Sequence, residues 1–169
     1  MVNEDVRNAI RTVLKAYHDA QDKLTKGWLK TCLTWHVKYL EMFIMTALVS
    51  EEAQKTTPGV DLSKCRRDQQ GTMMRDPKRD IFKYEHTYPI AQMREKLIEV
   101  SDPRRGVSED QIITDLEKEL AKFDIIWLLK EEDHKLNVNG YRYYRPENPL
   151  DAYEDSGIKL LPRDGDGQI

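Results

Sequence analysis

The chain has 169 residues, with 27 lysines and arginines against 30 aspartates and glutamates, and this balance excludes a uniformly basic nucleic-acid binder. Its length suits one domain with its own core. Two cysteines, Cys32 and Cys65, are too few for a disulfide framework or a four-thiolate zinc site. The longest charge-free apolar stretch, residues 42–50, is far shorter than the roughly 20 residues of a membrane-spanning helix. We therefore expect a cytoplasmic protein with no membrane partner.

Two helical patterns open the chain. Apolar residues recur at helical spacing over residues 4–25, which predicts an amphipathic helix with one side facing a core. After Gly27, residues 28–54 carry apolar residues on two faces, as in a central helix with neighbours on both sides. We expect the two helices to pack as an antiparallel pair, and the longer one also to offer a surface for a second copy of the chain or for another protein.

Residues 56–78 contain prolines and glycines but few apolar residues, so we expect a long loop that is functional or mobile. Residues 64–83 include seven cations and three carboxylates, and this local excess of positive charge would attract a phosphate-bearing partner. The alternative is a solvated loop whose cations pair with nearby acids. The cations are Lys64, Arg66, Arg67, Arg75, Lys78, Arg79 and Lys83.

The second half of the chain mixes strands and helices. Residues 79–86 alternate as in a strand, Pro89 suits the start of a helix, and Ser108 with Gln111 has the form of a capping box. Residues 123–129 are almost all apolar and predict a buried strand that pairs with residues 79–86.

After that strand, residues 130–137 predict one or two helical turns, and the rest reads as loop, with a short strand at 158–161. The fold class we expect is α+β, mainly α, with a long helical hairpin and a small sheet of two to three strands flanked by helices. We expect a single domain over residues 1–162, divided into a hairpin (1–55), a basic loop (56–78) and an α/β part (79–162), with a flexible tail at 163–169.

The residues that best suit catalysis or metal binding are Glu85-His86-Thr87-Tyr88-Pro89-Ile90, where a predicted strand ends in a carboxylate and an imidazole. These six residues resemble the first half of the motif of HNH nucleases. The resemblance implies that His86 is the general base that activates water for attack on phosphate, and that Glu85 is a ligand of a divalent metal ion, Mg²⁺ or Mn²⁺, with Zn²⁺ as an alternative. A plain alternative is an ion-pair and helix-capping role for both residues.

The family's second half supplies an asparagine and a further histidine or asparagine from the ββα-metal hairpin and helix. The nearest match here is Glu132-Asp133-His134-x-x-Asn137, which would add Asp133 and His134 as metal ligands, although two predicted helices separate it from the first half. If residues 79–86 and 123–129 pair as parallel strands, the two halves meet at one sheet edge; if the strands are antiparallel, they lie at opposite ends. Glu85 and His86 converge only where the strand ends or bulges between them.

The residues that we expect to contact nucleic acid are cations on either side of this motif. Arg79 and Lys83 would hold the phosphate, and the stretch from Tyr141 to Arg145 mixes aromatic rings with cations, although its tyrosines equally suit the edge of a core. The full set is Arg66, Arg67, Arg79, Lys83, Arg142 and Arg145.

Two hypotheses on function follow. The first is a metal-dependent endonuclease or nuclease-like protein that hydrolyses phosphodiester bonds with a histidine base. The second is a non-enzymatic helical interaction module that regulates or inhibits a larger complex. The spatial arrangement of the side chains distinguishes the two hypotheses, since only the enzyme needs Glu85, His86 and a third ligand around an open coordination position.

Overall fold

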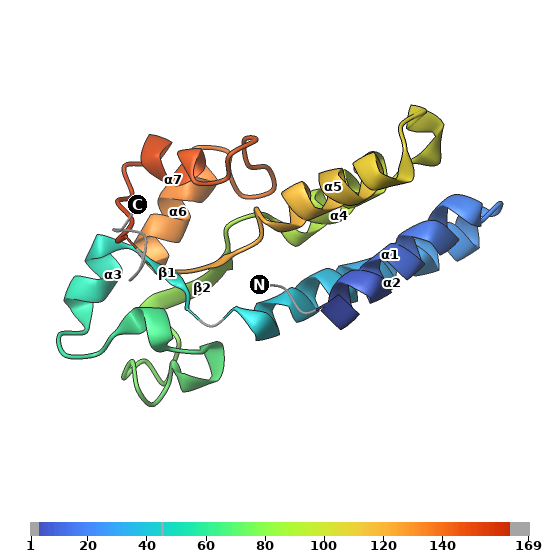
Figure 1. Cartoon of the computed structure of the whole chain (residues 1–169). Helices are drawn as coiled ribbons and strands as arrows, with labels where there is room; N and C mark the ends of the chain where they lie inside the picture. Colours follow the sequence, from blue (N-terminus) through green and yellow to red (C-terminus); the bar gives the residue numbers. More distant parts are fainter. Residues whose placement is uncertain (1–3, 45, 163–169) are drawn as a thin grey trace. The chain divides into compact units, whose positions relative to one another are not determined.

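The computed structural model describes residues 4–44 and 46–162 of the chain. The tail predicted at residues 163–169 lies outside the described residues. The described chain forms two compact units (Figure 1), and each of them is built from two separate stretches of sequence. Unit 1 comprises residues 4–44 and 88–123, and unit 2 comprises residues 46–87 and 124–162. These boundaries differ from the predicted subdivision into 1–55, 56–78 and 79–162, and our expectation of one domain over residues 1–162 stays a prediction.

Unit 1 is helical. The chain runs through α1 (Glu4–Asp19), α2 (Lys23–Tyr39) and the 3₁₀ turn η1 (Leu40–Phe43), and returns through α4 (Ile90–Val100), η4 (Pro103–Arg105) and α5 (Glu109–Leu120). The helices pack in sequence, α1 on α2, α2 on α4 and α4 on α5. Their buried sides form an apolar core, to which α1, α2, α4 and α5 contribute Ile10, Leu14, Leu29, Leu33, Val37, Met93, Leu97, Leu116 and Leu120.

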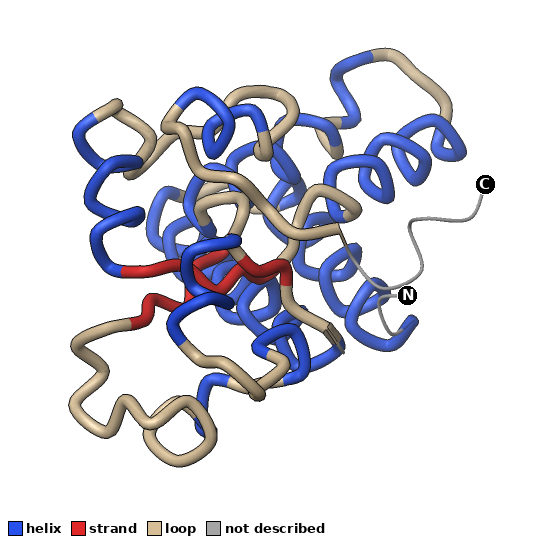
Figure 2. The backbone as a smooth tube through the Cα atoms, turned by 90° about the vertical axis from the view of Figure 1, so that its left-hand side faces the viewer, coloured by secondary structure: helices blue, strands red, loops and turns tan. Residues whose placement is uncertain are grey.

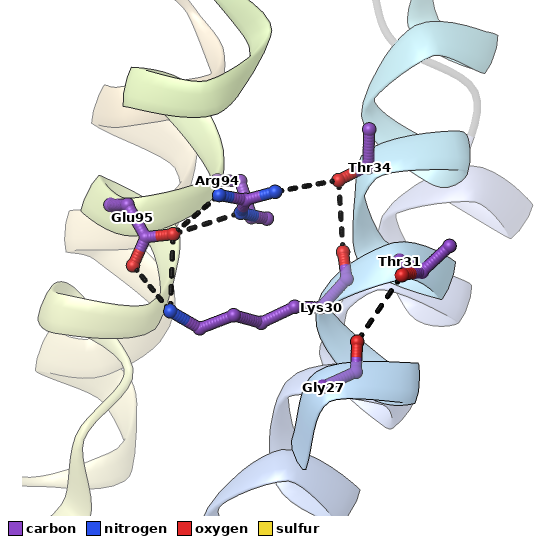
Figure 3. A network of polar contacts seen from close by, with 6 residues as sticks. All are labelled: Gly27, Lys30, Thr31, Thr34, Arg94 and Glu95. Atoms are coloured by element: carbon purple, nitrogen blue, oxygen red, sulfur yellow. Dashed lines mark hydrogen bonds and ion pairs between the residues drawn. The ribbon is translucent and has the colours of Figure 1, made fainter. Parts of the chain in front are cut away.

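Polar contacts also join α2 to α4 (Figure 3). Lys30 Nζ lies 2.9 Å from Glu95 Oε2, and Arg94 donates a hydrogen bond of 3.1 Å to Thr34 Oγ1. Arg94 contacts Glu95 as well, so the three charged groups form one small network. Because these groups are partly exposed, each pair adds on the order of 1 kcal/mol or less, and the apolar core supplies most of the stability.

The helical hairpin of α1 and α2 confirms the predicted packing of the first two helices, but the predicted boundaries are wrong. The first helix ends at Asp19, because Asp22 caps a new helix by accepting a hydrogen bond of 2.8 Å from Thr25 N. The helix predicted over residues 28–54 ends at Tyr39, and after η1 the chain leaves unit 1 for the sheet of unit 2.

Unit 2 contains a three-stranded sheet (Figure 2) built from β1 (Leu48–Val49), β2 (Phe82–His86) and β3 (Ile125–Leu129). The strand order is β1-β3-β2, with β1 parallel and β2 antiparallel to β3. The predicted pairing of the two longer strands is therefore confirmed. Residue 160, within the predicted strand 158–161, forms only an isolated bridge to Ser50.

Short helices and a long loop complete unit 2. These elements are α3 (Glu51–Thr56), the 3₁₀ turns η2 (Leu62–Lys64) and η3 (Arg67–Gln69), α6 (Lys130–Val138) and α7 (Asp151–Asp155). The predicted helical turns after β3 correspond to α6, whereas α7 stands where we expected loop. Helix α6 packs on β2 and β3. One face of β3 joins α6 and α7 in a buried cluster of Ile126, Leu128, Leu136, Ala152, Tyr153 and Ile158.

Helices predominate in the described chain, and a small mixed sheet is flanked by helices, which confirms the expected class, α+β and mainly α. No helix among the described residues combines the length and the apolar character needed to cross a membrane.

Candidate functional site

Strand β2 determines the direction in which Glu85 points. In the antiparallel ladder Glu85 lies directly opposite Ile126 of β3, and paired residues project from the same face of a sheet. Ile126 belongs to the buried cluster formed with α6 and α7. Glu85 therefore lies on the face of the sheet that these helices cover, and its side chain keeps only 22% of its surface exposed.

His86 is the last residue of the same strand and is paired with Ile125. The ladder is regular up to this position, so the two neighbours Glu85 and His86 project from opposite faces. On the face of His86, the rings of Tyr84 and Trp127 are in contact, with their centroids 4.7 Å apart. The strand ends after His86 and not between the two residues, so the condition under which they would converge is not met.

Helix α6 brings the second half of the motif back over the sheet. Because β2 and β3 are antiparallel, the end of β3 lies opposite Phe82, at the far end of β2 from His86. The chain then turns directly into α6, which packs on both strands. The neighbouring Glu132 is buried in this turn, where its Oε2 accepts hydrogen bonds from Ser50 Oγ (2.6 Å) and Leu129 N (2.9 Å). Glu132 thus anchors the start of the helix that carries Asp133.

The charge of Asp133 acts on the Glu85 carboxyl. Burial raises the pKa of the Glu85 carboxyl above its ordinary value, and the charge of Asp133 raises it further. Lys83, whose Nζ lies 3.6 Å from Glu85 Oε2, and Arg145 act in the opposite direction without reversing the shift. The charges of Asp133, Lys83 and Arg145 therefore all act on the Glu85 carboxyl, whereas for antiparallel strands we expected the two halves of the motif at opposite ends.

Arg145 lies inside unit 2, with 2% of its surface exposed, and its guanidinium sits 5.5 Å from the centre of the Tyr153 ring. Tyr153 is fully buried, and burial raises the pKa of its hydroxyl. Our expectation that Arg145 contacts nucleic acid is therefore wrong for the chain as it is folded, since a buried guanidinium cannot reach a phosphate backbone. Its charge acts instead on Glu85 and on Tyr153.

The predicted ligand set Glu85, Asp133 and His134 is not assembled. Among the described residues, no three or more His, Cys, Asp or Glu side chains lie together as metal ligands would. His134 is exposed, whereas Asp133 is half-buried. One turn along α6, Asn137 donates a hydrogen bond of 3.4 Å to Asp133 Oδ2, so a carboxamide accompanies the carboxylate on this side of the helix.

The basic loop is exposed and is held from within by Asp76. Arg66, Arg67 and Arg79 all have exposed side chains. Asp76 is buried, and its carboxylate accepts hydrogen bonds from the backbone N–H groups of Asp80 (2.8 Å), Ile81 (3.1 Å) and Phe82 (3.0 Å) and from Gln70 Nε2 (2.9 Å). Burial acts to raise the pKa of Asp76, but these hydrogen bonds outweigh it and lower the pKa.

Two arginines of this loop have unusual backbone conformations. Arg75 and Arg79 have positive φ angles of 55° and 54°, which side-chain-bearing residues rarely adopt and which cost about 1–2 kcal/mol each. The network around Asp76 compensates for this strain. Such strained residues cluster at functional sites, and here they are two of the cations predicted to attract phosphate.

The remaining predicted contact, Arg142, is exposed, and its guanidinium lies 5.1 Å from the ring centre of the exposed Tyr143. Lys83 is half-exposed but turned to Glu85. Of the six cations expected to contact nucleic acid, Arg66, Arg67, Arg79 and Arg142 therefore have exposed side chains on unit 2.

Sequence reasoning passed over Asp76 as the organiser of the loop and Tyr153 as the partner of Arg145. A signal existed for Asp76, because an aspartate before Pro77 in a glycine- and proline-rich segment often accepts backbone hydrogen bonds in a turn. None existed for Tyr153, whose burial depends on the docking of α7.

The described residues line two cavities, one in each unit. One, of about 500 Å³ in unit 2, borders β1 and η2, and the other, of about 690 Å³ in unit 1, borders α1 and α5. Glu85 and Asp133 line neither of them.

Three comparisons with known proteins, by family model, by curated sequence and by solved structure, give no match.

Proposed function

We propose that this protein is a metal-dependent phosphodiester hydrolase, a nuclease of the two-strand-and-helix type that the Glu85-His86 motif resembles. The observation that carries the proposal is the arrangement of β2, β3 and α6: two antiparallel strands followed at once by a helix that packs back on them. This arrangement brings the Glu85 carboxyl under the electrostatic influence of Asp133, which the motif pairs with it.

The donor set suits a hard divalent cation better than zinc. Mg²⁺ and Mn²⁺ are commonly held by one or two carboxylates, with water and substrate phosphate oxygens completing the shell, whereas a structural zinc site needs four protein ligands. Glu85 and Asp133 would hold the ion, and Asn137, whose Nδ2 donates a hydrogen bond to Asp133 Oδ2, would orient the Asp133 carboxylate. When bound, such an ion stabilises negative charge that develops on the phosphate.

The residues around the carboxylate pair have complementary tasks. Arg145 and Lys83 favour the ionised form of Glu85, which is the form that binds a cation. His86, on the opposite face at the end of β2, would take the proton of the attacking water, with substrate bound across the strand end. The exposed arginines of the basic loop, Arg66, Arg67 and Arg79, would hold the phosphate backbone.

The test is nicking of supercoiled plasmid and cleavage of labelled RNA by the purified chain with Mg²⁺ or Mn²⁺, with EDTA as the metal-free control. We expect cleavage that His86→Ala and Asp133→Asn each reduce by at least about a hundredfold, as general-base and metal-ligand losses do. His18→Gln, a histidine of unit 1 bonded to Ser101, is the matched control and should cut like the parent.

A second measurement separates binding from chemistry. Mn²⁺ should raise the melting temperature of the parent chain and of His86→Ala but not that of Asp133→Asn, because only the last variant loses a proposed ligand. Absence of both cleavage and metal stabilisation across metals and substrates would refute the nuclease. The alternative would then be an interaction module, for which the exposed aromatic side of α2 provides a surface.

A further inference from the structure

Helix α2 exposes a row of large apolar side chains. Leu24, Trp28, Trp35 and Tyr39 of the helix and Met42 of η1, here called the α2 face, recur at intervals of three, four or seven residues and so follow one side of the helix. Leu24 is 86% exposed, Trp28 65% and Trp35 58%.

The α2 face is not needed for the packing of unit 1. Leu29, Leu33 and Val37 are the buried residues of the helix, and α2 turns them towards the neighbouring helices. Two of the three tryptophans of the chain lie on the exposed side instead. Contiguous exposed apolar side chains of this size mark a binding surface, since water solvates them poorly.

The charge of α2 restricts the class of partner that the α2 face could bind. Over Lys23–Tyr39 the helix carries four lysines and no aspartate or glutamate. Lys38 Nζ lies 5.0 Å from the centre of the Trp35 ring, so one cation already sits beside an aromatic ring of the face. Lys30 is paired with Glu95, whereas Lys23 and Lys38 have exposed side chains.

These charges disfavour a second copy of the chain as the occupant, because two α2 faces brought together would oppose lysine to lysine. The face needs a partner that is both negatively charged and able to cover flat aromatic rings. Single-stranded nucleic acid has both properties, since its phosphates carry charge and its unpaired bases stack on aromatic side chains. In a duplex the bases are already stacked on each other.

We propose that the α2 face binds single-stranded nucleic acid, with bases stacked on Trp28 and Trp35 and phosphates held by Lys23 and Lys38. Seven helical residues separate the tryptophans by about 10 Å along the axis, which is the length of about three stacked nucleotides. This inference rests on the proposed function for the nature of the polyanion, and it adds a binding surface in unit 1 to the cleavage site in unit 2.

The experiment titrates the full chain with a labelled oligothymidylate and with a duplex hairpin of equal length, in EDTA so that no substrate is cut. Label anisotropy measures affinity, and the part of the tryptophan fluorescence that the double variant at Trp28 and Trp35 lacks reports on the α2 face, since Trp127 is buried in unit 2. We expect the oligothymidylate to bind more tightly than the hairpin and to quench the fluorescence. The double variant Trp28→Ala/Trp35→Ala should bind at least about tenfold more weakly. Lys38→Gln should reduce the slope of log K against log salt by about 0.7.

Val107→Ala is the matched control, because Val107 is an exposed apolar residue of unit 1 that lies outside the α2 face. It should bind oligothymidylate like the parent, and circular dichroism should show all variants folded, as their side chains are exposed. Oligothymidylate affinity that survives in the double variant overturns the inference even if the parent cuts nucleic acid. Loss of affinity in that variant supports the proposed surface, even if the absence of both cleavage and metal stabilisation refutes the nuclease.

If the parent binds neither probe, the inference also fails. Sedimentation would then measure the oligomeric state. A dimer that Leu24→Ala and Trp28→Ala weaken alike would show that the α2 face binds a second copy of the chain.

Discussion

At the scale of single residues, the buried carboxyl of Glu85 makes stability depend on pH. Its folded-state pKa lies above the ordinary value of 4.5, so its contribution to stability is full below that pH and is lost as the pH rises through the folded pKa. Glu85→Gln, which cannot ionise, should therefore raise the free energy of unfolding at neutral pH and lose that advantage below about pH 4. Urea denaturation at both pH values measures this.

Glu52 provides the control for Glu85. It is exposed, and its hydrogen bond with Lys55 lowers its pKa, so Glu52→Gln should not stabilise the chain at neutral pH. A Glu85→Gln variant less stable than the parent at neutral pH would mean that Lys83 and Arg145 outweigh burial, contrary to our assignment.

Asp76 is the residue whose loss should harm unit 2 most. Asp76→Ala leaves three buried or half-buried backbone N–H groups and the amide of Gln70 without their acceptor, and should cost about 3 kcal/mol. Because its pKa is lowered, the stabilisation exists above pH 3.8 and is lost as the pH falls through the folded pKa. Denaturant titration of Asp76→Ala and of Asp80→Ala, a variant of an exposed neighbour, tests this. Equal losses of unfolding free energy in the two variants would contradict the role of Asp76 as the acceptor that holds the loop.

At the scale of elements, the basic loop combines strain with exposure. Arg79 has a left-handed backbone, so Arg79→Gly should relieve strain and leave the chain as stable as the parent or about 1 kcal/mol more stable, while weakening nucleic-acid binding. Arg67→Gly, in the 3₁₀ turn η3, should lower stability by about 0.5–1 kcal/mol. Thermal unfolding and anisotropy on the same variants separate the two effects. A strong loss of stability in Arg79→Gly would show that its side chain, not its backbone, matters to the fold.

How far sequence predicts this fold depends on whether the signal is local. The cap at Ser108 and the apolar strand at 125–129 could be predicted because each rests on neighbouring residues. The pairing of that strand with β2 could be predicted because both segments have strand patterns, but its antiparallel direction could not. The end of α2 could not, since the apolar pattern continues past Tyr39 while the chain changes from helix to 3₁₀ turn and strand. Tertiary contacts decide that change.

For the candidate site, the residues could be identified from the sequence, but the directions in which their side chains point could not. Glu85 and Asp133 were predicted as partners from motif residues, yet the electrostatic effect of Asp133 on Glu85 depends on the packing of α6 on the antiparallel strands. Arg145 reads as a surface cation between Tyr144 and Pro146, and its burial follows from the docking of Tyr153, which no local pattern indicates.

At the scale of the whole molecule, α4 and α5 are inserted between two strands that pair directly. The backbone N–H of Thr87 donates to Asp124 O (2.9 Å), so the insertion leaves and re-enters unit 2 at adjacent points. A shortened chain that begins at residue 46 and joins Thr87 to Asp124 through a two-residue turn should fold alone, because its apolar cluster lies wholly within unit 2. Cooperative urea unfolding followed by Trp127 fluorescence tests this, and a broad, non-cooperative loss of signal would show that unit 2 depends on the rest of the chain.

The same insertion sets an order of events during folding. Strands β2 and β3 cannot pair until the intervening chain has closed into a loop. That closure costs conformational entropy before any hydrogen bond between the strands forms. Helices α4 and α5 can form locally within microseconds and shorten the path between the strand ends. The carboxylate pair Glu85 and Asp133, which needs both strands and α6, should therefore assemble late, so the chain acquires its proposed chemistry only after most of its helices exist.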